Sequence, residues 1–158
     1  MNKNTKIAVV GVGNLLLKDE GVGVHIVHAL QKSGKLPDHV QLIDAGTATF
    51  DILHLIEDVD KLIVIDAVEG GGEPGTVYRF SPDDVEFGNL SAISLHELDL
   101  SNTLAMAELL GNKPKSVVII GIEPKEITLC LELSPQIEAK IEKIIELTLK
   151  EIGSGIRN

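Results

Sequence analysis

The stretch Leu62–Val68 reads LIVIDAV and decides the fold. Every residue in it except Asp66 is apolar, and most are β-branched, which favours an extended strand. A continuous apolar run of this length is typical of a strand that a parallel sheet buries on both faces. Four further stretches have a similar character and are predicted to be strands: Lys6–Gly11, Val40–Asp44, Thr76–Phe80 and Ser116–Gly121.

Between these stretches the apolar residues recur at helical spacing. Helices are predicted over Glu20–Gln31, Thr47–Glu57 and Leu104–Leu110. In the second of them, Phe50, Leu53 and Ile56 form the expected buried face. A last helix is predicted to begin at Ser134 as its cap, with Pro135 in the first turn. Its expected buried stripe consists of Ile137, Ile141, Ile144, Ile145 and Leu149.

Strands alternate with helices along nearly the whole chain, whereas residues 81–100 are mixed and polar and are predicted to form a long loop. We therefore predict a single α/β domain over residues 1–158. Its sheet is expected to be doubly wound and mostly parallel, with about five strands and helices on both faces. Ligands of such folds bind beyond the carboxyl ends of the strands, so functional residues are expected there.

The composition excludes several classes of partner. The chain has 158 residues, of which 14 are basic and 24 acidic, so its net charge is −10. Such a surface repels nucleic-acid phosphates, and no nucleic-acid partner is expected. No apolar run approaches the ~20 residues of a membrane helix, so no membrane partner is expected either. The single cysteine, Cys130, and the absence of a secretory leader pattern favour the cytoplasm.

The loop after the first strand contains two glycine-rich motifs. Gly11–Leu16 begins like a dinucleotide-binding fingerprint, but Leu16 stands where that fingerprint has its third glycine. The adjacent acids Asp19 and Glu20 also disfavour a phosphate ligand. On local grounds Asp19 is expected to cap the following helix. Asp66 is different, because a carboxylate that closes a buried strand is costly unless it is paired, liganded or exposed at a cleft.

The histidines fall into two groups. His25 and His28 lie three residues apart on the polar face of the first helix, and they are expected to be surface residues, as is His54. His96 lies in the sequence SLHEL, which begins like a zinc-protease motif but has Leu100 where that motif needs its second histidine. No nucleophile elbow is present, and Cys130 is expected to be a small core residue.

Three motifs together point to a known family. They are GVGNLLLKDEGVG at 11–23, which contains Glu20, IVIDAV at 63–68, which contains Asp66, and ISLHEL at 93–98, which contains His96. With Asp44-Ala45-Gly46-Thr47 and Pro74-Gly75-Thr76, these make the chain resemble the hydrogenase maturation endopeptidases over nearly its whole length. That family processes the large subunit of nickel–iron hydrogenases.

The resemblance implies an aspartyl-type endopeptidase that removes the C-terminal extension of a large-subunit precursor after nickel insertion. It implies that Glu20, Asp66 and His96 bind the metal and carry the catalysis. The metal would be nickel borne by the substrate, with zinc or cadmium able to substitute in vitro. These two carboxylates and an imidazole suit such ions. Substrate contacts are expected at Gly13, Asn14, Asp19, Asp44, Gly46 and Thr47.

The role of the metal and the choice among three possible functions stay open. The metal could activate water or merely position the scissile bond while Asp44 or Asp19 acts as base, and we favour positioning. The glycines beside Glu20 are expected to let the substrate backbone approach closely. The alternative functions are a non-catalytic, chaperone-like nickel-binding module of hydrogenase assembly and a small nucleotide-binding α/β protein.

Overall fold

The computed structural model describes residues 5–82 and 95–155, and of residues 95–99 it describes the backbone only. The described strands are β1 (Ile7–Val12), β2 (Val40–Gly46), β3 (Lys61–Ala67), β4 (Val77–Phe80) and β5 (Ser116–Ile122). The α-helices are α1 (Val22–Ser33), α3 (Leu95–Leu109), α4 (Pro135–Glu138) and α5 (Ile141–Gly153). Two 3-10 helices, η1 (Lys18–Gly21) and η2 (Thr49–Leu55), complete the described elements.

The five strands form one sheet in the order β2-β1-β3-β5-β4. All neighbours pair in parallel except β4, which is antiparallel to β5 at the edge. The chain leaves β1 toward β2 on one side and later returns to β3 on the other, as in a doubly wound fold. The predicted mostly parallel α/β sheet is therefore confirmed.

Alternate residues of the strands face two separate cores. On one face Ile7, Val9 and Ile63 pack with α1, α4 and α5. On the other face Ala8, Val10 and Val64 pack with η2 and α3. This alternation follows from the two-residue period of a strand, and it explains why the strands are apolar throughout.

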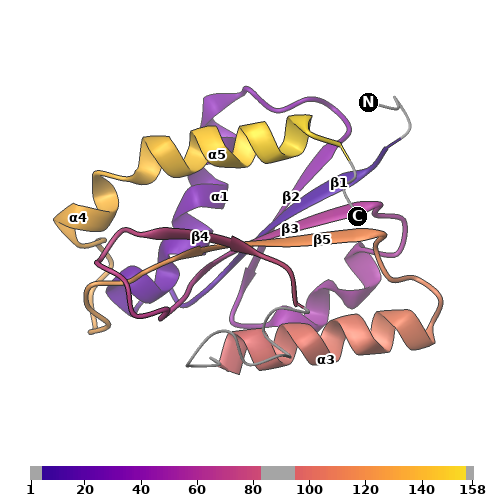
Figure 1. Cartoon of the computed structure of the whole chain (residues 1–158), viewed down its shortest axis with the longest axis horizontal. Coiled ribbons are helices and arrows are strands. Elements are labelled where there is room, and N and C mark those ends of the chain that lie inside the picture. Colours follow the sequence, from indigo (N-terminus) through magenta and orange to yellow (C-terminus); the bar gives the residue numbers. More distant parts are fainter. Residues whose placement is uncertain (1–4, 83–94, 156–158) are drawn as a thin grey trace.

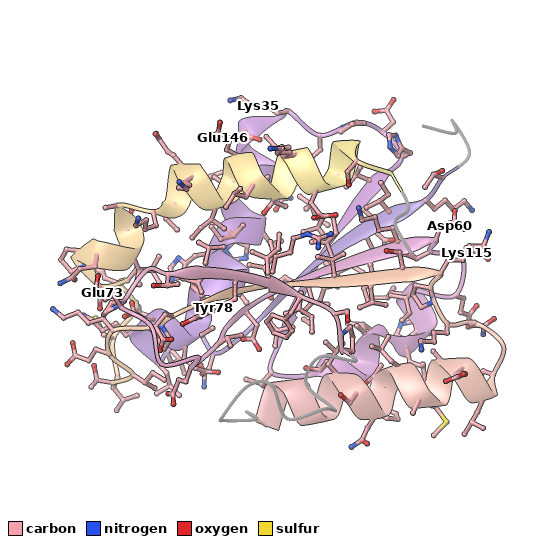
Figure 2. All side chains as sticks on the ribbon, in the orientation of Figure 1. Lys35, Asp60, Glu73, Tyr78, Lys115 and Glu146 are labelled. Carbon is pink, nitrogen blue, oxygen red and sulfur yellow. The ribbon has the colours of Figure 1, made fainter. Side chains whose placement is uncertain are left out.

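Figure 1 shows the resulting three layers, with α1 and α5 on one side of the sheet and α3 on the other. The strands β1, β3 and β5 end on the side of the molecule where α3 begins, because α3 runs antiparallel to the strand that follows it (Figure 1). We call this side the carboxyl edge. In Figure 2, Tyr78 and Glu73 lie toward the carboxyl edge, whereas Asp60 and Lys115 mark the opposite end of the sheet.

Two predictions about the bounds of elements need correction. Helix α3 begins at Leu95, so part of the predicted loop is helical, and residues 83–94 lie outside the described residues. The predicted last helix is two helices, α4 and α5, and the turn at Gly75 packs against Gln136 and Lys140 near the break.

No described helix is long and apolar enough to cross a membrane.

The predicted helix at Thr47–Glu57 is also different in kind. It is the shorter 3-10 helix η2, in which residues three apart lie on one face, so Thr49 and Ile52 are buried. Phe50, expected to be buried, is half exposed, whereas Ile56 is buried as predicted. The α-helical period that we applied to this segment was wrong.

Candidate active site

The glycines of the 11–23 motif serve packing within the chain. A Cβ atom on Gly23 would lie 2.0 Å from the carbonyl oxygen of Ile65, and one on Gly11 would lie 2.4 Å from that of Gly23. These two glycines therefore let α1 lie directly on β1 and β3. Gly13 has a φ of +139°, and a Cβ there would lie 2.0 Å from the carbonyl oxygen of Glu20. The expectation that these glycines admit a substrate backbone stays a prediction, since the direction of a Cβ at Gly11, Gly13 and Gly23 is already filled by this chain.

Glu20 is held at the end of β1 by its own loop. Its backbone packs against Gly13, and its Oε2 accepts a hydrogen bond of 3.3 Å from the amide of Asn14. The amide of Gly13 in turn donates to the carbonyl of Gly46, at 2.8 Å, which joins the loops that follow β1 and β2. The structure therefore brings together four of the predicted site residues, namely Gly13, Asn14, Glu20 and Gly46.

Asp66 closes β3 immediately beside this loop. Its neighbour in the sheet is Gly121 of β5, and it is only 3% exposed. Its Oδ1 accepts a hydrogen bond of 2.8 Å from the amide of Ala67. Because strand residues alternate, Asp66 shares the orientation of Leu62 and Val64, toward the face that α3 covers. The η1 helix that carries Glu20 contacts β3, so the two carboxylates come from neighbouring segments of the carboxyl edge.

His96 lies in the first turn of α3. That turn is on the carboxyl edge and on the sheet face toward which Asp66 points (Figure 1). The side chain of His96 is outside the described residues. Among the side chains that are described, no three His, Cys, Asp or Glu residues form a group that could hold a metal ion. A ligand set of Glu20, Asp66 and His96 thus stays a prediction.

Asp19 has a role that the sequence did not suggest. It is fully buried, and its carboxylate accepts hydrogen bonds from the amides of Lys125 (2.9 Å), Glu126 (3.0 Å) and Ser134 (2.7 Å) and from the Ser134 hydroxyl (2.7 Å). Burial alone would raise the pKa of Asp19, but these hydrogen bonds outweigh it and lower the pKa. Asp19 does not cap α1, whose N-cap is Gly21. With no exposed surface, it is also not placed to contact a substrate.

Asp44 points away from Asp66. Its Oδ2 lies 2.9 Å from Nε2 of His28 on α1, and its Oδ1 accepts a hydrogen bond from the amide of Gly46. It therefore belongs to the α1 face of the sheet, whereas Asp66 faces α3. The opposite sheet face of Asp44 and the complete burial of Asp19 disfavour both as a base at a site beside Asp66. Thr47 is exposed in the turn after β2.

The other histidines and the cysteine differ partly from expectation. His54 is exposed, as predicted, but His25 is half-buried. Its Nε2 is buried without a hydrogen-bond partner among the described residues, and burial lowers its pKa. Cys130 is half-buried in a bridge with Leu17 instead of lying in the core.

Glu123 is a further buried carboxylate at the carboxyl edge, and it was not among the predicted site residues. It directly follows β5, is 7% exposed, and its Oε1 accepts hydrogen bonds from the amides of Gly70 (2.8 Å) and Gly72 (3.1 Å) and from the Tyr78 hydroxyl (2.6 Å). Burial and the hydrogen bond to Glu123 raise the pKa of Tyr78, which Figure 2 labels near the carboxyl edge. The rule that ligand sites follow strands, applied to the fifth strand, would have pointed to Glu123.

Glu123 shapes a cavity of about 430 Å³ between the loops that follow β3 and β5. Its lining includes Glu69, Glu123, Lys125, Glu126 and Ile127. This size is within the range of small-molecule sites. The cavity opens where β3 has just ended at Asp66 and Ala67. Ligands of doubly wound α/β folds bind at this edge of the sheet, so the cavity lies where a ligand site is expected.

Comparisons with known proteins identify the family. Residues 24–151 match the family model of the hydrogenase maturation proteases. The chain is 39% identical over 155 residues to the hydrogenase expression/formation protein HupD of Thiocapsa roseopersicina, covering 97% of this chain and 70% of that relative. It is 37% identical over 153 residues to the hydrogenase 2 maturation protease of Escherichia coli K12, covering 96% and 93%.

The structural similarity is equally extensive. The hydrogenase maturating endopeptidase HybD from E. coli superposes with a TM-score of 0.86 and 35% identity, over 97% of this chain and 96% of that one. The chain therefore belongs to the hydrogenase maturation protease family, and it is a hydrolase of the endopeptidase type. This assignment favours the enzyme over the non-catalytic nickel module and the nucleotide-binding protein.

Proposed function

We propose that this chain removes the C-terminal extension of a nickel–iron hydrogenase large-subunit precursor after nickel has been inserted. Family membership and the names of the relatives support this substrate class. The observation that carries the proposal is the position of Asp66, a buried carboxylate at the end of a central strand, with Glu20 on the neighbouring η1 and with α3 on the side it faces.

We assign nickel recognition to Glu20, Asp66 and His96. Two carboxylates and an imidazole suit a borderline divalent ion, and three protein ligands leave coordination positions for the thiolates of a precursor that carries the nickel. Zinc or cadmium could take the same donors in vitro. Holding the ion against the carboxyl edge would fix the peptide tail near the cleft, and such positioning lowers the entropic part of the barrier.

The catalytic residues proposed are the same three. The carboxylate of Asp19 is fully engaged in four internal hydrogen bonds, and Asp44 faces α1. The carboxylate chemistry of an aspartyl-type protease is therefore assigned to Glu20 and Asp66. We expect the reaction in the cytoplasm, without nucleic acid or membrane as partner, and the net charge of −10 supports the exclusion of nucleic acid.

The direct test is cleavage of a nickel-loaded precursor, read by mass spectrometry. The wild-type chain should shorten the precursor by its C-terminal extension, and the nickel-free precursor should stay intact. Glu20→Gln, Asp66→Asn and His96→Ala should each slow cleavage by about a hundredfold or more, which is the usual effect of losing a catalytic group. Thermal unfolding checks that each variant is folded.

The matched control is His54→Ala, which removes an exposed histidine on η2 and should cleave at the wild-type rate. Full cleavage by the Asp66→Asn variant would show that the site is assigned wrongly. Efficient processing of nickel-free precursor would show that nickel is not what the enzyme recognises.

A further inference from the structure

Four large apolar side chains are exposed on the two segments that flank the candidate site. Leu129 is 85% exposed, Leu131 66%, Leu16 57% and Ile127 42%. We call this group the apolar ridge. One exposed leucine is ordinary, but a contiguous exposed apolar group on a soluble protein usually marks an interaction surface.

One backbone bridge holds the two segments of the ridge side by side. Leu17 and Cys130 form a parallel bridge, in which the amide of Lys18 donates to the carbonyl of Cys130 and the amide of Cys130 donates to that of Leu16, each at 2.9 Å. Leu17 and Cys130 are half-buried, whereas their neighbours Leu16, Leu129 and Leu131 are exposed. The bridge brings the backbone of Leu16 beside that of Cys130, so the exposed leucines of the two segments are neighbours.

Hydrogen bonds to the buried Asp19 also hold the segments in place. The buried carboxylate of Asp19 holds the amides of Lys125, Glu126 and Ser134, which bracket the ridge residues 127–131. The amide of Asp19 donates to the carbonyl of Glu126 at 3.3 Å as well. The exposure of the leucines is therefore built into the fold, since the backbone that presents them is fastened at both ends.

The ridge is continuous with the candidate active site. Ile127 also lines the cavity beside Glu123, and the amide of Glu20 donates to the carbonyl of Leu17 in the bridged segment, at 3.2 Å. Exposed Glu126 and Glu132 flank the apolar residues, which gives an apolar centre with a charged rim, as in protein–protein interfaces. A protein seated on the ridge would therefore lie directly beside Glu20 and the cleft.

We propose that the apolar ridge is the docking surface for the folded body of the precursor protein, and that it holds this body while the C-terminal tail enters the cleft. The inference rests on the proposed function, because the occupant is the protein substrate of that site. A protein whose cleaved tail reaches the cleft must place its remaining surface next to the cleft, and among the described residues the ridge is an exposed apolar surface at that place.

The test compares a chain carrying Leu129→Ser and Leu131→Ser with a control carrying Leu109→Ser and Leu110→Ser. The control leucines are 82% and 59% exposed; Leu109 is the last residue of α3 and Leu110 follows it, at the opposite end of the molecule (Figure 1). With nickel-loaded precursor, the ridge variant should show a KM at least tenfold higher and a kcat within twofold of wild type. The control should match wild type in both, since exposed substitutions elsewhere change little.

Direct binding of the same precursor, measured by biolayer interferometry, separates this inference from the proposed function. Ridge-dependent binding without cleavage by the wild type would support docking and contradict the protease assignment. Equal KM and equal affinity for ridge variant, control and wild type would overturn the docking surface. A wild-type dimer in analytical ultracentrifugation that the ridge variant dissociates would overturn it too, because a second copy would then be the occupant.

Discussion

At the scale of the residue, the buried carboxylate of Asp19 connects two segments that are far apart in the sequence. Its carboxylate is surrounded by four donors from a segment more than a hundred residues away. Asp19→Asn keeps the shape but replaces one acceptor oxygen by an NH₂ group that faces other donors. We expect the free energy of unfolding to fall by about 2–4 kcal/mol, since hydrogen bonds to charged groups are worth about 1.5–3 kcal/mol and unmatched buried donors add to the loss. Urea denaturation at pH 7 measures this.

The control for that prediction is Asp38→Asn, at an exposed position, which should change stability by no more than about 0.5 kcal/mol. A loss below about 1 kcal/mol for Asp19→Asn would mean that the carboxylate charge is not what joins the two segments.

At the scale of the element, the position of α1 depends on Gly23. Its missing side chain lets the helix rest on the carbonyls of Ile65 and Val12, where a Cβ would lie 2.0 Å and 2.6 Å away. Gly23→Ala must push α1 off the sheet and displace the loop that carries Glu20. We expect a loss of about 3 kcal/mol or more, at the upper end of overpacking effects, measured by thermal and urea unfolding.

Gly153→Ala serves as the matched control. Gly153 ends α5, and a Cβ there would meet nothing within 4 Å. Alanine at that position should be neutral or should stabilise the protein by up to about 1 kcal/mol, because it reduces the freedom of the unfolded chain. Equal effects of the two substitutions would contradict the packing role of Gly23.

At the scale of the whole molecule, a buried ionic network fastens the C-terminal helix to the sheet. Lys61, fully buried at the start of β3, donates to Glu151 Oε2 (2.7 Å), to the Glu151 carbonyl and to Gly155. Arg79 of β4 donates to the other carboxylate oxygen of Glu151 at 2.6 Å. Burial by itself would raise the pKa of Glu151, but the bonds from Arg79 and Lys61 lower it to about 2.

This network predicts an acid sensitivity with a definite sign. A carboxyl whose pKa is lowered on folding stabilises the folded state above its unfolded value of 4.5, and the stabilisation disappears as pH falls from 4.5 toward 2. Glu151→Gln should therefore lower the free energy of unfolding by about 3 kcal/mol at pH 7, because it leaves Lys61 without its counter-charge. The difference from wild type should shrink steadily below pH 4.5 in urea titrations. A difference that is constant between pH 7 and pH 3 would contradict the assigned ionisation.

Much of the fold follows from local pattern. Each apolar run and each helical period is a property of neighbouring residues, so all five strands, α1 and the order of elements were predictable. The same holds for the family, because the motifs that contain Glu20, Asp66 and His96 can be compared directly with those of known families. In η2 the spacing of the apolar residues fits more than one kind of helix, and the predicted α-helix was wrong.

The tertiary structure decided what the polar residues do. Asp19 and Ser134 are 115 residues apart, and Lys61 and Glu151 are 90 apart, so no local pattern links them. The face to which Asp44 or Asp66 points depends on the register of each strand in the sheet, and that register is a property of the assembled core. Sequence therefore determined the elements and the family, because both depend on residues close along the chain. Only folding determined which carboxylates are buried and connect distant segments, and which lie at the carboxyl edge. The reason is that burial and long-range hydrogen bonds exist only in the packed molecule.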